Sequence, residues 1–205
     1  MYHLVRKDSA VPPGRPRCFD VDQALDRALD VFWRKGYEGT TLPDLTRAMG
    51  INRPSLYAAF GNKEDLFKKA IDRYAQGPGC HVKEALSEPT ARRVIEQLLH
   101  GTVDLLTNRR NPRGCFMVQG ALACGESADP VRRELVKRRA DSESALRERF
   151  ERAIAEGDLP PSSDSAALAG YVVTICHGMA VQAAGGATKS ELTRVAEMAI
   201  RACPT

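Results

Sequence analysis

Two short amphipathic stretches that meet at a glycine, within residues 41–60, constrain the fold of this chain more than any other feature. Thr41 is suited to cap a first helix, Gly50 can adopt the positive φ that a tight turn needs, and Asn52 is suited to cap a second helix. A helix, a tight turn and a second short helix in this order are the layout of a helix-turn-helix.

The two predicted helices each divide into an inner and an outer face. Ile51 and Leu56 fall where the small core of such a unit needs aliphatic side chains, and the leucines and Met49 of the first helix complete that core. The outer face of the second helix carries short or donor-rich side chains, as a helix that lies in the major groove of DNA requires. These outer residues are Asn52, Arg53, Ser55, Tyr57 and Ala58.

The remainder of the chain is predicted to be helical, because no run alternates for long enough with the period of two residues that a strand requires. The clearest break in composition is the Gly-Pro-Gly run at residues 77–79, and we place a domain boundary there. The chain then divides into a flexible basic arm (1–19), a helix-turn-helix domain (20–76) and a second helical domain (77–205). The helices are expected at about 20–35, 41–49, 52–60, 62–76, 89–107, 115–124, 130–156, 164–184 and 189–203.

The arm at residues 1–19 has two interpretations. Prolines at positions 12, 13 and 16 suppress helix, and basic residues outnumber the one acid, Asp8. Either the arm is an ordinary solvated terminus, or it touches the backbone or minor groove of DNA. Its basic residues are Arg6, Lys7, Arg15 and Arg17.

The run from Thr40 to Leu66 resembles the DNA-binding domain of the TetR/AcrR family of transcriptional regulators. It carries the family's paired threonines, helix-turn-helix, Leu-Tyr-x-x-Phe run (56–60) and Lys-Glu-x-Leu run (63–66), in the family's order and spacing. Beyond the glycine break the resemblance rests on helix number and length and on a Gly-Cys-Phe-Met pattern at 114–117. It implies an all-α fold, with an N-terminal three-helix helix-turn-helix DNA-binding domain and a C-terminal helical domain that binds a ligand and dimerises.

The resemblance also implies which residues meet DNA. Arg53 would read guanine through its bidentate fork, Thr41 and Tyr57 would hold phosphates, and the others would contact phosphates or base edges. Each has a structural alternative: capping for the threonine and the asparagine, core packing for the tyrosine, and a solvated face for Arg53 and Lys63. The implied DNA-binding residues are Thr41, Asn52, Arg53, Pro54, Ser55, Tyr57 and Lys63.

Two residues depart from the family's usual pattern. Thr46 stands where alanine is frequent, and its hydroxyl is expected to bond the carbonyl four residues before it. Pro54 stands where glycine is common, and it removes one backbone donor that could hold a phosphate. Neither change disrupts the fold, but the proline would alter the operator contacts.

The second half is implied to dimerise and to bind a small-molecule effector of unknown identity. The last two predicted helices are rich in small and apolar residues, and two copies of them would form a homodimer interface, with a monomeric core as the alternative. A pocket is expected where a few polar groups interrupt apolar stretches, although a lone His or Cys in a helix belongs more often to the core. The predicted lining residues are Leu98, Thr102, Phe116, Gln119, Leu122 and His177.

A thiol sensor is the first alternative to a ligand pocket. Cys115 follows Gly114 at a predicted helix start, where the helix dipole and nearby arginines would lower the thiol pKa, so that an electrophile or oxidant would release DNA. If the Cys115 side chain is buried, the thiol would be inert. Cys80-His81 and Cys176-His177 are weak metal candidates, because neighbours on a helix diverge by about 100°. No metal or cofactor is therefore expected.

Other classes of protein find less support. The chain has no glycine-rich phosphate loop, H-E-x-x-H or G-x-S-x-G, so an enzyme is not expected, and a helical interaction adaptor would leave the helix-turn-helix unexplained. The net charge of +4 is too small to decide about DNA. We expect no membrane-spanning run, and the N-terminus lacks a secretory signal, which indicates the cytoplasm. The sequence thus predicts a ligand-responsive repressor released from a palindromic operator when its fourth helix moves.

Overall fold

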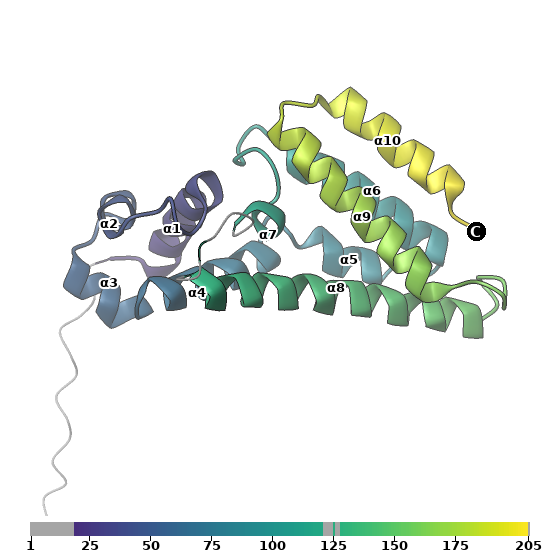
Figure 1. Ribbon diagram of the computed structural model, residues 1–205, viewed down its shortest axis with the longest axis horizontal. Coiled ribbons are helices and arrows are strands. Elements are labelled where there is room, and N and C mark those ends of the chain that lie inside the picture. The colour runs from purple at the N-terminus through teal and green to yellow at the C-terminus, as the bar shows by residue number, and fades with distance from the viewer. Residues whose placement is uncertain (1–18, 121–124, 126–127, 205) are drawn as a thin grey trace, which may run out of the picture.

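The computed structural model describes residues 19–120, 125 and 128–204. Figure 1 shows a group of helices, α1–α4, at one end and a long bundle, α5–α10, extending from it. The helices are α1 (Val21–Lys35), α2 (Leu42–Met49), α3 (Arg53–Phe60), α4 (Lys63–Gln76), α5 (His81–Leu86), α6 (Ala91–Thr107), α7 (Phe116–Gln119), α8 (Asp129–Ala155), α9 (Ser165–Ala184) and α10 (Lys189–Ala202). No strand occurs in the described part of the chain, which confirms the predicted all-α fold.

Local capping signals set where the helices of the helix-turn-helix begin. The Thr41 hydroxyl accepts a hydrogen bond from the backbone N–H of Asp44 (3.2 Å) at the start of α2. The Asn52 side chain accepts one from the backbone N–H of Ser55 (2.9 Å) at the start of α3. Gly50 lies between the helices with φ of 69°, in the left-handed region that favours glycine. Each signal acts within four residues, and the prediction of this unit is confirmed.

An aromatic cluster joins the helix-turn-helix end to the bundle. Phe32 of α1 and Phe67 of α4 meet edge to face with ring centroids 5.0 Å apart, and Phe116 of α7 lies 5.2 Å from Phe67. Val131 and Leu135 of α8 belong to the same buried cluster. Side chains from the second half of the chain therefore complete the core of the first half, while a second core fills the bundle itself.

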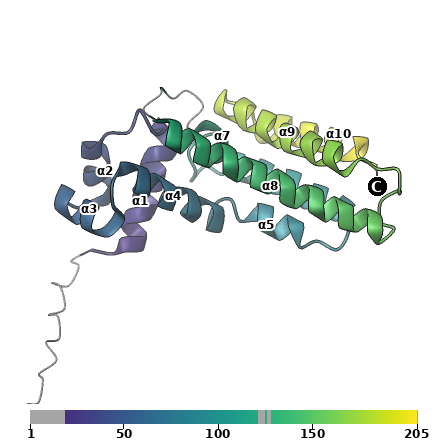
Figure 2. The same cartoon turned by 60° about the horizontal axis from the view of Figure 1, so that its bottom comes forward.

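The long helix α8 runs the length of the bundle. Figure 2 shows it between α5 on one side and α9 and α10 on the other, and it packs against α4, α5 and α9. Its first turns contact the helix-turn-helix end, where Arg138 forms an ion pair with Asp72 of α4 (2.8 Å). A helix with this reach can link the two ends of the molecule mechanically.

Several predicted boundaries need correction. The six-residue α5 was not predicted; it has no side-chain cap and is held by packing against α6. The helix expected at 115–124 is only α7, and residues 121–124 lie outside the described residues. The predicted arm also loses its last residue, because Phe19 packs against Phe60 with ring centroids 6.4 Å apart. Residues 1–18 of the arm lie outside the described residues.

Helix α9 corrects the expectation about membrane-spanning runs. Among the described residues it is the one helix that is long and apolar enough to cross a membrane by length and composition, so the prediction that no such run exists is wrong. It packs against α6, α8 and α10 in the bundle, yet only 33% of its most apolar window is buried. Its exposed side, which includes Tyr171 and Val181, is the part that the rest of the bundle does not cover.

Candidate nucleic-acid interface and ligand cavity

The outer face of α3 is free of other protein contacts that would hide it. Arg53, Pro54 and Tyr57 are exposed, and the tyrosine ring keeps 48% of its surface accessible. Leu56 and Phe60 of the same helix point into the core and are almost fully buried. The two-faced pattern predicted from the sequence is therefore present, and Tyr57 is not the packed core residue that was its alternative.

Thr41 is exposed, but its donors are already used. Its backbone N–H and its hydroxyl both donate to one carboxylate oxygen of Asp44 (3.0 and 2.8 Å). Lys35 pairs with the other oxygen (2.9 Å), and these hydrogen bonds, the one with Lys35 foremost, lower the pKa of Asp44. The charge of this cap therefore persists throughout the neutral range. A phosphate at Thr41 would have to displace the Asp44 carboxylate.

Lys63 and Pro54 of the predicted interface, and Thr46 close to it, each have a defined local environment. The ammonium of Lys63, at the start of α4, lies 4.3 Å from the centroid of the Tyr37 ring, which is a cation–π arrangement. The hydroxyl of Thr46 donates to the Leu42 carbonyl (3.0 Å), four residues before it, as predicted. Pro54 lies in the first turn of α3, where its missing N–H costs the helix no bond.

A cavity of about 870 Å³ lies within the bundle next to α4. Leu98, Thr102 and His177, all predicted lining residues, do line it. Phe116 does not, because its side chain is fully buried in the aromatic cluster, and Gln119 does not line it either. Leu122 lies outside the described residues. The predictions for Phe116 and Gln119 are thus wrong. The sequence of this segment does not reveal whether a side chain faces the cavity or packs into the aromatic cluster.

Several of the polar groups in the cavity wall are uncharged. Thr102 donates to the Leu98 carbonyl (2.7 Å), and its hydroxyl lies 3.2 Å from Nε2 of His81. Burial lowers the pKa of His81, and burial together with nearby Arg139 lowers the pKa of His177. Both imidazoles are therefore neutral at neutral pH. This mixture of apolar wall and a few polar groups is typical of small-molecule sites.

Arg139 lines the same cavity, although the sequence analysis did not select it. Its Nη1 atom donates to the Met117 carbonyl of α7 (2.6 Å). In the sequence Arg139 lies within a run of alternating charges on α8 that is typical of a solvated face. Its position four residues after Leu135 and seven before Leu146, both buried, is the one signal that could have placed it near the inner face.

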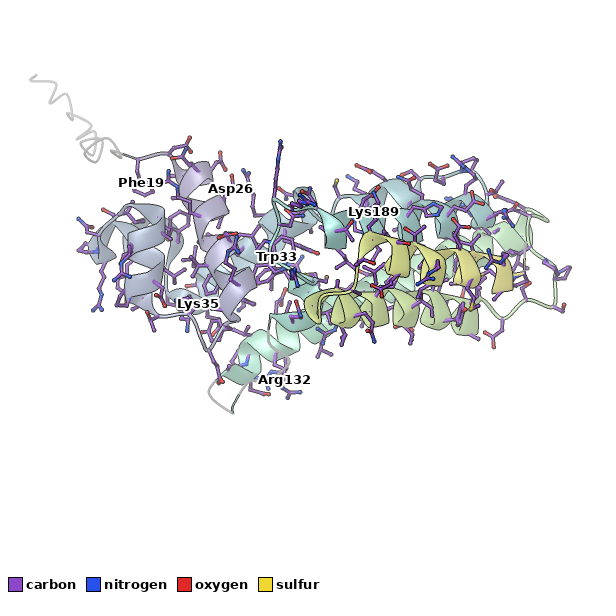
Figure 3. The ribbon with its side chains drawn as sticks, turned by 90° about the horizontal axis from the view of Figure 1, so that it is seen from above. Phe19, Asp26, Trp33, Lys35, Arg132 and Lys189 are labelled. Atoms are coloured by element: carbon purple, nitrogen blue, oxygen red, sulfur yellow. The ribbon has the colours of Figure 1, made fainter. Side chains whose placement is uncertain are left out.

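Segment 114–120 contacts both the cavity and the helix-turn-helix. The Trp33 indole N–H of α1 donates to the Gly114 carbonyl (3.1 Å), and Figure 3 shows Trp33 where the two ends of the molecule meet. The backbone N–H of Tyr37 donates to the Gly120 carbonyl (3.0 Å). Met117 and Val118 of the same segment line the cavity. A change at the cavity wall can thus reach α1 through one short piece of chain.

Cys115 does not have the properties predicted for a reactive thiol. Burial raises its pKa, and its sulfur lies 3.2 Å from the Tyr74 hydroxyl. The expected lowering by a helix dipole fails because α7 has only four residues and the desolvation of the sulfur is the larger effect. Within the described residues, no three His, Cys, Asp or Glu side chains converge as a metal site would require.

We expect Cys115 to react slowly with alkylating reagents. A raised pKa leaves less thiolate at any given pH, and the Cys115 side chain is only partly exposed. Labelling by iodoacetamide at neutral pH, followed by mass spectrometry, should be at least about ten-fold slower at Cys115 in the folded protein than in the urea-unfolded chain. Equal rates in the two states would show that the thiol is exposed and reactive.

Comparisons with known proteins agree with this architecture. Residues 24–70 match the family described as "Bacterial regulatory proteins, tetR family", and residues 89–199 match "Tetracyclin repressor-like, C-terminal domain". The HTH-type transcriptional repressor ComR of Escherichia coli (strain K12) is 33% identical over 93% of this chain and 92% of its own length.

Solved structures give the same result. A cysteine-substituted form of the TetR family transcriptional regulator CifR, complexed with 26-bp double-strand operator DNA, is 44% identical, with a TM-score of 0.89 over 93% of this chain and 100% of its own. A TetR transcriptional regulator from Chloroflexus aurantiacus J-10-FL, 20% identical, shares the fold with a TM-score of 0.77, over 88% of this chain and 92% of its own.

The helix-turn-helix, the helical bundle behind it and these matches together define a DNA-binding transcriptional regulator rather than an enzyme. The chain belongs to the TetR family.

Proposed function

We propose that this regulator is a homodimeric repressor that binds a palindromic operator and leaves it when a small molecule occupies the cavity. The observation that carries the proposal is segment 114–120, which lines the cavity, bonds Trp33 of α1 through Gly114 and bonds Tyr37, just after α1, through Gly120. The repressor function is supported by the relatives ComR and BdcR, both HTH-type transcriptional repressors of Escherichia coli (strain K12). A regulator of this kind works in the cytoplasm, where the chromosome is.

The operator would be read by the exposed face of α3. Arg53 is its one cationic side chain and has the fork that matches the O6 and N7 atoms of guanine. Asn52, Ser55 and Tyr57 would add contacts to phosphates and base edges, and Lys63 would reach the backbone from the start of α4. Thr41 would contribute only where a phosphate displaces Asp44.

Release would follow from a population shift between two arrangements of the domains, which we divide at residues 77–79. A ligand in the cavity would move α4, whose Tyr74 lines the wall, and with it the recognition helices of both subunits. A second route would run through segment 114–120, because the Trp33 indole of α1 bonds the Gly114 carbonyl. Two recognition helices at the wrong separation no longer match two half-sites.

Replacing Arg53 with Ala should weaken operator binding by about 1–3 kcal/mol, roughly 5- to 150-fold, because one bidentate base contact is lost. The operator is first obtained by selecting bound sequences from random duplex DNA, and affinities are then measured by fluorescence anisotropy at one fixed salt concentration. Arg147→Ala, at an exposed position on α8, is the matched control and should bind as the original protein does. An unchanged affinity for Arg53→Ala would remove this residue from the base-reading set.

The same selection tests the proposal as a whole. A palindromic sequence supports a two-fold dimer that reads two half-sites, whereas no enriched sequence at low salt contradicts operator binding. The selection is repeated with a thiol oxidant, since a thiol sensor on this scaffold is the alternative. Because Cys115 is only partly exposed and its thiol pKa is raised, we expect the oxidant to leave the selected sequence and its affinity unchanged.

A further inference from the structure

Two neighbouring arginines in the cavity wall differ in how their charges are balanced. Arg138 pairs with Asp72 (2.8 Å) and Glu134 (2.7 Å), so its charge is neutralised. Arg139 takes part in none of the ion pairs formed by the described residues, and its one hydrogen bond there goes to the uncharged Met117 carbonyl. Arg139 is also partly desolvated, which lowers its pKa.

The other charged groups that line the cavity do not compensate Arg139. Asp141 pairs with Lys137 (2.8 Å), and Lys83 and Glu84 are exposed on α5 with opposite charges. The neutral His177 imidazole feels both the Arg139 charge and the carboxylate of Glu143. Glu143 lies one turn beyond Arg139 on α8 but does not line the cavity and forms no ion pair with Arg139 among those of the described residues. The cavity wall therefore carries a guanidinium without a counter-ion.

Much of the rest of the wall is apolar. Leu98, Leu105, Leu106, Val118 and Val173 all line it, and the volume of about 870 Å³ lies within the range of roughly 300–1,000 Å³ found for sites of small organic molecules. An unpaired cation next to an apolar wall is complementary to a molecule that has both an anionic group and an apolar body.

We propose that the cavity binds a small organic carboxylate, whose anionic group pairs with Arg139 and whose apolar body lies against the leucines and valines of the wall. This inference rests on the proposed function, because it names the chemical class of the effector for the same cavity. A guanidinium and a carboxylate form two parallel hydrogen bonds, and such a pair is strongest where water is partly excluded.

The hydrogen bond between Arg139 and α7 suggests how binding of a carboxylate would affect the DNA-binding end of the molecule. Nη1 of Arg139 now holds the Met117 carbonyl of α7. A bound carboxylate would compete with this carbonyl for the guanidinium and loosen α7, which Trp33 and Phe116 tie to α1 and α4. An alcohol of the same length would fill the apolar wall without drawing Arg139 away.

The test measures binding to the purified full-length protein by isothermal titration calorimetry. The probes are the straight-chain carboxylates from hexanoate to dodecanoate, each compared with the alcohol and the amine of the same length. We expect carboxylates to bind at least about ten-fold more tightly than the matched alcohols, because a charge-assisted pair is lost in the alcohol. Arg139→Gln should remove that preference, and Arg139→Lys should keep part of it.

Arg133→Gln is the matched control, since Arg133 lies on the same helix and is exposed toward solvent. It should bind carboxylates as the original protein does, and circular dichroism checks that each variant is folded. Equal binding of carboxylates, alcohols and amines would overturn the inference, as would an Arg139→Gln variant that still prefers carboxylates or a chain to which no carboxylate binds.

Operator binding, measured on the same samples, separates this inference from the proposed function. Carboxylate binding without release of the operator would support the assignment of the ligand class and contradict effector-driven release. Operator binding by a protein that ignores all carboxylates would overturn the ligand class alone.

Discussion

Replacing Val181 with Glu is expected to convert a dimer into monomers and to abolish tight operator binding. Val181 is 54% exposed on α9, in the surface that we propose pairs with a second copy. A two-fold interface would receive two buried carboxylates without partners, and an uncompensated buried charge costs about 3–5 kcal/mol. Even if only one of these two charges is counted, the dissociation constant of the dimer should rise by at least roughly 150-fold.

The prediction that this surface forms the dimer interface rests on the exposed apolar side chains of α9 and α10. Val181 and Tyr171 on α9, with Val195 and Met198 on α10, are four of the six large hydrophobic side chains that are exposed in the described part of the chain. A side chain added at Gly178 of α9 would meet nothing within 4 Å, so the backbone of this helix is open to close approach. Figure 3, the view from above, shows α9 and α10 side by side at the face nearest the viewer, and regulators of this family act as dimers.

Val136→Glu provides a matched control, because Val136 is also a helical valine and is 46% exposed, but lies on α8. It should remain dimeric and bind the operator as before. Mass is measured by light scattering after size-exclusion chromatography, and operator affinity by fluorescence anisotropy. If Val181→Glu stays dimeric at the same concentrations as Val136→Glu, the interface lies elsewhere.

The helix-turn-helix could be predicted from the sequence because its determinants are local. Thr41, Gly50 and Asn52 each act on backbone within four residues, and the alternation of Leu56 with exposed neighbours follows directly from helical period. The exposure of Arg53 and Tyr57 on the outer face follows from the same period. Contacts of these residues with DNA remain a prediction.

The cavity could be predicted only in part, because its wall is assembled from segments far apart in the sequence. Leu98, Thr102 and His177 could be predicted because they lie on largely apolar helices that had to face a core, where a few polar groups interrupt the apolar residues. Phe116 was misjudged, because the aromatic cluster that takes up its side chain leaves no local pattern in the sequence. Whether Cys115 reacts with oxidants stays a prediction to be tested. Arg139 was missed because it lies among other charged residues of α8, and such a run predicts a solvent-exposed face. The sequence does not show that other segments pack over this position.

Replacing Phe116 with Ala should lower the free energy of unfolding by about 3–5 kcal/mol. The Phe116 ring is fully buried and lies within 6.4 Å, centroid to centroid, of Trp33, Phe67 and Tyr74. Removing it leaves a hole at the junction of α1, α4 and α7, where well-packed aromatic neighbours cannot easily collapse. A loss of this size is a large share of the roughly 5–15 kcal/mol that stabilises a typical domain.

Phe19→Ala is the matched control for this prediction. Phe19 is half-buried, and the one ring that it contacts among the described residues is Phe60, so its loss should cost clearly less. Unfolding is followed by urea titration at a single protein concentration, because dimer formation would add a concentration-dependent contribution. If Phe116→Ala costs no more than Phe19→Ala, α7 does not fasten the bundle to the helix-turn-helix, and transmission must run through α4 and its Asp72–Arg138 ion pair.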